Sequence, residues 1–169
     1  TSRKIVTPAR AGVLLSIYVG LGLNAWGRLA NDRDQDRQRY AKQAGAQPMI
    51  QARLQGGTPQ EAAALVSYTN NPKSPLRVGR AAKPAMPVKY WVIGNEPDLI
   101  GPSYTVADYV RDFISYATAM KAADPSIKIL GPEISQYNGP MAPPIDSTGT
   151  PWLDGFLRGI AKYESAHHV

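Results

Sequence analysis

Three short apolar segments recur at a nearly constant interval, with helical patterns between them. They occupy residues 48–50, 88–93 and 127–130, so successive segments begin about 40 residues apart. Apolar runs of this length predict strands buried on both faces, and strands connected by helices are parallel. A strand-and-helix period of about 35 to 40 residues suits a (β/α)8 barrel of about 250 to 300 residues.

We therefore predict an α/β fold, a partial (β/α)8 barrel in which these segments are strands three to five. A complete doubly wound sheet is the competing architecture, because 169 residues suffice for one. The length favours a single domain. Residues 29–169 are assigned to the partial barrel, and residues 1–28 form an N-terminal segment without a clear assignment.

Capping patterns predict where the helices begin. Thr58-Pro59-Gln60-Glu61 and Thr105-Val106-Ala107-Asp108 each place a threonine at the N-cap and an acidic residue three positions later. The sequence Thr150-Pro151-Trp152-Leu153-Asp154 gives a similar signal, with a threonine, a proline and an acidic residue four positions after the threonine, and predicts a third helix. An earlier helix is predicted over about residues 29–44, closed by Gly45.

The apolar run at residues 11–23 has two interpretations. Arg3, Lys4 and Arg10 precede it, as basic residues precede the apolar part of a signal peptide, and export would follow from that interpretation. The alternative is a buried strand. The run is shorter than the roughly 18 to 20 apolar residues that span a bilayer, so no membrane span is predicted. The cellular compartment stays open.

The charge of the chain does not predict a nucleic-acid partner. The formal net charge is +6, but the cations are mostly dispersed among acidic residues rather than gathered on one face. The exception lies within residues 62–95, which contain no Asp or Glu; its cations Lys73, Arg77, Arg80 and Lys83 fall between a helix and the next strand. We expect them to stay solvated or to pair with acidic groups elsewhere. The absence of cysteine excludes disulfides and thiolate metal sites, and no metal or cofactor is expected.

Polar residues follow the second of the three predicted strands. Asn95 and Glu96 come directly after the strand, at the end where catalytic and binding residues lie in parallel α/β folds. Gly94, just before them, allows a close backbone approach. A carboxylic acid in apolar surroundings can protonate a glycosidic oxygen, and a neighbouring amide can hydrogen-bond a ring hydroxyl. Glu96 is therefore a candidate catalyst; the alternative is an ordinary charged loop residue.

The longer phrase around this pair resembles a known family, the large clan of retaining glycoside hydrolases built on (β/α)8 barrels. The phrase is Tyr90-Trp91-Val92-Ile93-Gly94-Asn95-Glu96-Pro97, and the flanking residues 45–50, 62–70 and 128–133 resemble strand three, its helix and strand five. The resemblance implies that Glu96 is the general acid/base and that Asn95 contacts the sugar 2-hydroxyl. It further implies a carbohydrate substrate for the parent protein.

The sequence also departs from that clan. The clan's nucleophile is a glutamate after strand seven, whereas His167-His168-Val169 resembles the start of strand six, so the chain is expected to be a fragment that lacks the nucleophile and is inactive in isolation. Glu133, after the next strand, is expected to be structural or to contact substrate rather than to replace the missing nucleophile. Asp98 is expected to hydrogen-bond its own backbone rather than to be a second catalyst.

Aromatic residues near the predicted strand tips could stack on sugars. Trp91 could contact substrate or pack in the core, and Tyr137, in the loop after residues 127–130, is the better subsite candidate. Tyr104 and Trp152 are further candidates for such a platform. A noncatalytic carbohydrate-binding or vestigial domain is the alternative function. Because part of a barrel exposes strand edges, self-association is expected.

Overall fold

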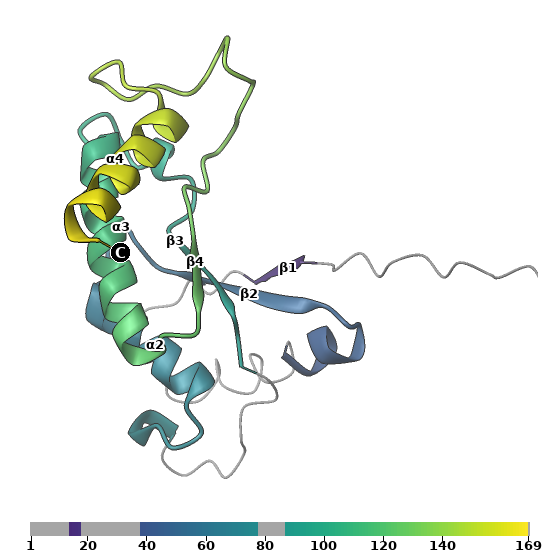
Figure 1. Ribbon diagram of the computed structural model, residues 1–169. Helices are drawn as coiled ribbons and strands as arrows, with labels where there is room; N and C mark the ends of the chain where they lie inside the picture. The colour runs from purple at the N-terminus through teal and green to yellow at the C-terminus, as the bar shows by residue number, and fades with distance from the viewer. Residues whose placement is uncertain (1–13, 18–37, 78–86, 169) are drawn as a thin grey trace, which may run out of the picture.

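The computed structural model describes residues 14–17, 38–77 and 87–168 (Figure 1). Its sheet contains four parallel strands in chain order: β1 (Leu14–Ile17), β2 (Gln47–Ala52), β3 (Tyr90–Ile93) and β4 (Lys128–Leu130). The three predicted strands are confirmed, and β1 supports the strand interpretation of residues 11–23. A doubly wound sheet reverses its strand order, and the order of these four strands does not reverse.

The strand register separates the two faces of the sheet. Met49, Tyr90 and Lys128 are direct partners across β2, β3 and β4 and so lie on one face. Ile50 and Trp91, one position further along, lie on the other face within the core. Figure 1 shows α2, α3 and α4 on the same side of the sheet.

The expectation that all three strands are buried on both faces is wrong for β4. Lys128 and Leu130 are exposed, and Ile129 is half-buried. In the described part of the chain β4 is the last strand of the sheet, so no further strand covers it. Lys128 and Leu130 also lie on the face of the sheet opposite the core, the face of Met49 and Tyr90, so their side chains remain accessible to solvent.

Two helices begin where their capping patterns predict. In α2 (Pro59–Asn70) the Glu61 amide donates to the Thr58 hydroxyl at 3.2 Å, and the Thr58 amide donates to the Glu61 carboxylate at 2.9 Å. Thr105 and Asp108 make the same reciprocal pair at the start of α3 (Val106–Ala123). Each of these reciprocal pairs, known as a capping box, provides hydrogen-bond acceptors for backbone amides that have no partner within the helix.

The third helix, α4 (Trp152–His167), begins differently from the prediction. Pro151, whose side chain has no polar atom, is its N-cap and provides no side-chain cap. The amide of Thr150, directly before it, donates to the Asp146 carboxylate at 3.0 Å. His167 is the last residue of α4 and His168 follows in the left-handed region, so the resemblance of residues 167–169 to a new strand is wrong for these two residues.

The helix predicted before β2 is described over residues 38–43. It ends as predicted at Gly45, which has φ 65°. The Ala46 amide donates to the Ala41 carbonyl at 2.8 Å, and the Gly45 amide donates to the Lys42 carbonyl at 3.2 Å, which together form a Schellman motif. The predicted start of this helix, and all of residues 1–28 except β1, lie outside the described residues.

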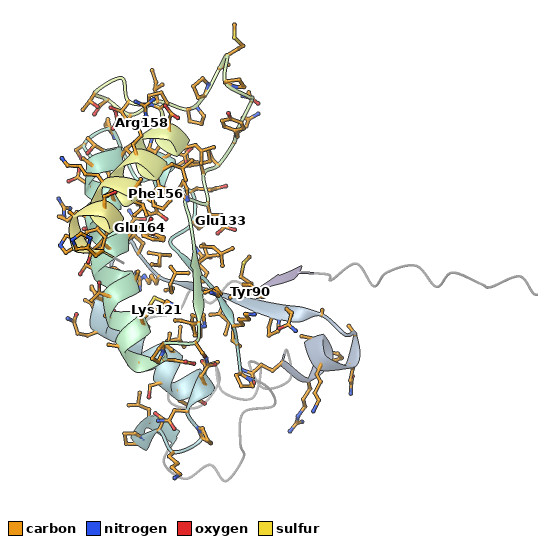
Figure 2. All side chains as sticks on the ribbon, in the orientation of Figure 1. Tyr90, Lys121, Glu133, Phe156, Arg158 and Glu164 are labelled. Atoms are coloured by element: carbon orange, nitrogen blue, oxygen red, sulfur yellow. The ribbon has the colours of Figure 1, made fainter. Side chains whose placement is uncertain are left out.

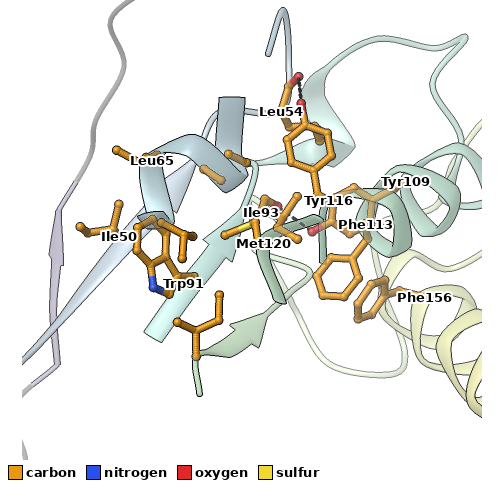
Figure 3. Close-up of a cluster of buried hydrophobic side chains, with 14 of the residues drawn as sticks. Ile50, Leu54, Leu65, Trp91, Ile93, Tyr109, Phe113, Tyr116, Met120 and Phe156 are labelled. Carbon is orange, nitrogen blue, oxygen red and sulfur yellow. Dashed lines mark hydrogen bonds between the residues drawn. The ribbon is translucent and has the colours of Figure 1, made fainter. Parts of the chain in front are cut away.

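The core lies between the sheet and the helices (Figure 3). α3 packs against both α2 and α4, and the aromatic rings of Tyr109, Phe113 and Phe156 join α3 to α4.

Asn70, the last residue of α2, connects this helix to the start of β3 and to the end of α3. Its side-chain amide donates to the Val88 carbonyl at 3.0 Å and to the Asp124 carboxylate at 2.7 Å. Its side-chain oxygen accepts from the Val88 amide at 2.8 Å.

Two of the four cations singled out in the sequence can be placed. Lys73 and Arg77 follow α2, with Arg77 ending the short 3₁₀ helix η2 (Pro75–Arg77), and Lys73 is exposed. This connection leads into the amino end of β3, so it lies opposite the end that carries Glu96. Arg80 and Lys83 lie outside the described residues. No described helix has the length and apolar character that crossing a membrane requires.

Candidate functional site

The backbone at the carboxyl end of β3 is shaped by Gly94. Gly94 has φ 77°, and a Cβ atom there would lie 2.9 Å from Cδ2 of Leu54. Its amide donates to the Ala52 carbonyl at 3.0 Å, which continues the pairing of β2 with β3. A residue without a side chain is therefore required immediately before Asn95 and Glu96.

Glu96 begins the short 3₁₀ helix η3 (Pro97–Leu99) and has a left-handed backbone, with φ 46° and ψ 54°. The Leu99 amide donates to its carbonyl at 2.9 Å. Its own amide donates to the Glu133 carbonyl, in the loop after β4, at 2.8 Å. The side chain of Glu96 is exposed, and that of Asn95 is half-buried. A left-handed non-glycine residue is strained, which is a property often found at functional sites.

Tyr109 supports the end of β3 from α3. Its hydroxyl donates to the Ile93 carbonyl at 2.8 Å. Burial and then the charge of Glu133 raise the pKa of Tyr109, so this hydroxyl keeps its proton. Gly131, just after β4, comes so close that a Cβ atom would lie 2.8 Å from the Tyr109 oxygen and 2.7 Å from Phe113. The carboxyl ends of β3 and β4 thus both pack against aromatic residues of α3.

Glu133 lies in this same region and is half-buried (Figure 2). Burial and the neighbouring charge of Glu96 both raise the pKa of Glu133. Both effects disfavour the ionised carboxylate. The structure therefore brings the predicted residues Glu96 and Glu133 together at the carboxyl ends of adjacent strands.

Asp98 has a partner that differs from the predicted one. Its carboxylate accepts hydrogen bonds from the amide of Ser135, at 2.9 Å, and from the Ser135 hydroxyl. The expectation that Asp98 bonds its own backbone is therefore wrong. Ser135 is 37 residues away in the sequence and follows β4, and only the pairing of β3 with β4 brings it close. Asp98 and Ser135 tie the two loops together beside Glu96 and Glu133.

The aromatic candidates divide between core and surface. Trp91 is fully buried and its indole donates to the Val88 carbonyl at 2.9 Å, so the predicted substrate contact is wrong and core packing is correct. Trp152 is also buried and Tyr104 stacks on it with 6.5 Å between ring centroids, so these two rings do not form a platform beside Glu96. Tyr137 is 50% exposed, in the loop that follows β4.

A cavity of about 410 Å³ is lined by residues from the loop after β2, the segment after η3, and α3. Its lining includes Leu54 and Gln55 after β2, Ile100 after η3, and Tyr104 and Asp112. Glu96 and Glu133 do not line it. The Tyr104 hydroxyl donates to the Asp112 carboxylate at 2.9 Å. This cavity is therefore separate from the predicted site.

Asp146 is buried, and its role in the fold was not predicted from the sequence. One carboxylate oxygen accepts from the Val106 amide at 2.9 Å, in the first turn of α3, and the other accepts from the amides of Thr148 and Thr150. The pattern Asp-Ser-Thr-Gly-Thr at residues 146–150 predicts a local turn, but not the contact with α3. Asp146 closes the base of the long loop between β4 and α4.

The described residues contain no group of three or more His, Asp or Glu side chains that could hold a metal ion. The chemistry that the carboxyl ends of β3 and β4 offer is proton transfer, from two adjacent carboxyl groups with an amide beside them.

Comparisons with known proteins agree on the fold. No protein family described by a sequence profile matches the chain, and no curated protein matches it. Among solved structures, the chain is similar to a family 51 α-L-arabinofuranosidase from Bifidobacterium longum, with a TM-score of 0.58 and 23% identity over 76% of this chain and 24% of that one.

Two further solved structures have similar scores. One is a glucosidase from Croceicoccus marinus, with a TM-score of 0.51 and 19% identity over 80% of this chain and 27% of that one. The other is a family 44 endoglucanase from Clostridium thermocellum, with a TM-score of 0.52 and 18% identity over 78% of this chain and 36% of that one. The chain thus spans about a quarter to a third of the length of these enzymes. At these identities the likeness shows a glycoside hydrolase-like α/β fold.

Proposed function

We propose that the chain is part of a retaining glycoside hydrolase that acts on a polysaccharide or oligosaccharide, with Glu96 as the general acid/base. The observation that carries the proposal is the position of Asn95 and Glu96 at the carboxyl end of a central parallel strand, in a chain whose fold is similar to that of glycosidases. In parallel α/β barrels, catalytic groups come from this end of the strands. In this proposal the complete enzyme is a (β/α)8 barrel.

In the proposed reaction the carboxylic acid of Glu96 protonates the glycosidic oxygen as its bond to the sugar breaks. Glu96 is then a carboxylate, and it takes a proton from the water that releases the sugar from the enzyme. A retaining mechanism needs a second carboxyl group about 5 to 5.5 Å away as the nucleophile. We propose that this nucleophile lies outside the residues of this chain, as the resemblance to the clan implies.

The substrate contacts are also part of the proposal. Asn95, directly before Glu96, would hydrogen-bond the sugar 2-hydroxyl. Tyr137 offers an exposed ring on the loop after β4, and Glu133 offers a carboxyl group beside Glu96. Trp91 is excluded from this set because it is fully buried.

The test is a set of aryl glycosides with leaving groups of graded acidity, given to the full-length gene product and to its Glu96→Gln variant. General acid catalysis contributes about 10²- to 10⁴-fold, so the variant should lose at least about 10²-fold on poor leaving groups and much less on good ones. Glu164→Gln, which changes an exposed glutamate of α4, is the matched control. Equal turnover of poor leaving groups by Glu96→Gln and the wild type would reject the proposal.

The exposure of Glu96 in the described residues favours a second candidate, a carbohydrate-binding domain without catalysis. A solvated carboxyl group can bind a sugar hydroxyl without acting as an acid. Calorimetry of this chain against oligosaccharides separates the two functions. Binding that Tyr137→Ala weakens, together with no hydrolysis by the full-length gene product, would favour the binding domain.

A further inference from the structure

Glu96 and Glu133 lie on loops that are fastened to each other at two points. The first is the hydrogen bond of 2.8 Å from the Glu96 amide to the Glu133 carbonyl. The second, two residues further along each loop, joins the Asp98 carboxylate to the amide and hydroxyl of Ser135. The loops after β3 and β4 therefore cannot separate without breaking these bonds, and the two glutamates stay adjacent.

The two carboxyl groups differ in their access to water. Glu96 is exposed, whereas Glu133 is half-buried. Removing a carboxylate from water disfavours its charged form, and so does a second carboxylate beside it. When two adjacent carboxyl groups compete for one proton, the less solvated group is the one that holds it.

The described groups around Glu133 reinforce this asymmetry. Among the ionisable side chains, Glu96 acts on it from the loop after β3, and Tyr109 faces it from α3. The hydroxyl proton of Tyr109 is already used in the bond to the Ile93 carbonyl, so it does not stabilise an ionised Glu133. Asp98, on the same loop as Glu96, receives its hydrogen bonds from Ser135.

We infer that Glu133 is the proton-holding partner of Glu96: of the two adjacent carboxyl groups, the half-buried one holds the proton. A protonated carboxyl group carries an O–H donor, so the pair offers a hydrogen-bond donor next to the carboxyl group of Glu96. What that donor binds rests on the proposed function, in which it would face a sugar hydroxyl. The position of the proton on Glu133 does not rest on it.

The experiment is a pH titration of the glutamate carboxyl carbons of this chain by NMR, in the wild type and in the Glu96→Gln variant. In the wild type, Glu133 should titrate above the ordinary glutamate value of about 4.3. In Glu96→Gln the neighbouring charge is absent, so the Glu133 midpoint should shift to lower pH. Glu164→Gln, far along α4, should leave it unchanged.

A second variant keeps the inference falsifiable if Glu96→Gln does not fold. Asp98→Asn weakens the tie to Ser135 and should also lower the Glu133 midpoint, because the loops can then move apart. Amide spectra of each variant confirm the fold. An ordinary Glu133 midpoint in the wild type, or one that neither variant moves, would overturn the inference.

The two proposals can fail separately, because the titration involves no sugar. A raised Glu133 midpoint that falls in Glu96→Gln, without hydrolysis of any aryl glycoside by the full-length gene product, would reject the glycosidase and leave the proton-holding role intact. Hydrolysis that depends on Glu96, together with an ordinary Glu133 midpoint, would do the reverse.

Discussion

The hydroxyl of Tyr109 donates its proton to the carbonyl oxygen of Ile93, the last residue of β3, at a distance of 2.8 Å. Tyr109 is fully buried, and so is Ile93. A side chain of α3 thus completes the backbone pairing of the strand that carries Asn95 and Glu96. The position of the site depends on this contact between a helix and a strand tip.

Tyr109→Phe should destabilise the chain, since it leaves the Ile93 carbonyl buried without this hydrogen bond. The expected loss in the free energy of unfolding is about 1 to 3 kcal/mol. Denaturant unfolding followed by circular dichroism measures it. Tyr40→Phe is the control, because Tyr40 is 68% exposed. Equal stability of the two variants would show that the hydroxyl of Tyr109 contributes nothing.

Gly94→Ala should cost more stability than the same change at Gly139. Both glycines have positive φ, 77° and 86°, so both substitutions strain the backbone. Only at Gly94 would the new Cβ atom collide, at 2.9 Å from Leu54, whereas nothing lies within 4 Å at Gly139. Backbone strain costs about 1 to 3 kcal/mol, and the contact adds to it at Gly94. Thermal unfolding of the two variants measures the difference, and a larger loss at Gly139 would contradict the account.

Asp146 should make stability depend on pH. Burial alone would raise its pKa, but hydrogen bonds from Thr148, Val106 and Thr150 outweigh burial and hold the pKa below its ordinary value. A group whose pKa is lowered by folding stabilises the folded state above its unfolded pKa of about 3.9, and this contribution disappears as the pH falls through the folded pKa.

Asp146→Asn should therefore lower stability at neutral pH by about 1 kcal/mol or more. The difference from the wild type should shrink as the pH falls below about 4. Unfolding curves between pH 7 and pH 3 measure this. Asp154→Asn is the control, because Asp154 pairs with Arg158 on the exposed surface of α4. A gap between Asp146→Asn and the wild type that stays constant with pH would contradict the assignment.

The edge of the sheet at β4 should cause self-association. Leu130 is 36% exposed on the last described strand, where unpaired backbone groups can accept another chain. We expect dimers or larger species at micromolar concentration, and a shift toward monomer in Leu130→Lys. Size-exclusion chromatography with light scattering measures the mass. Leu157→Lys, at an exposed leucine of α4, should not change it. A monomeric wild type would reject this prediction.

Local sequence patterns predicted much of the fold. The starts of α2 and α3 follow from Thr58 and Thr105 because a capping box is complete within four residues. The end of the helix at Gly45 is equally local. The start of α4 differs from the pattern by one residue, because Pro151 and not Thr150 is the N-cap of that helix.

The candidate site was only partly predictable. Asn95 and Glu96 follow from their place after a strand, but the partners of that segment lie far away in the sequence. The contact of Asp98 with Ser135 depends on the pairing of β3 with β4, which no local pattern encodes. Trp91 was ambiguous for a related reason: its face of the strand becomes known only once α2 and α3 cover it.

Asp146 also has a consequence for the long segment between β4 and α4. Its carboxylate holds the returning end of that segment against α3, while Met141, 95% exposed, stands clear of the body of the molecule. A segment anchored in this way can exchange or gain residues at its tip without disturbing the helices behind it. The contacts made by the segment between β4 and α4 could therefore change during evolution while the strands and helices that position Glu96 stay the same.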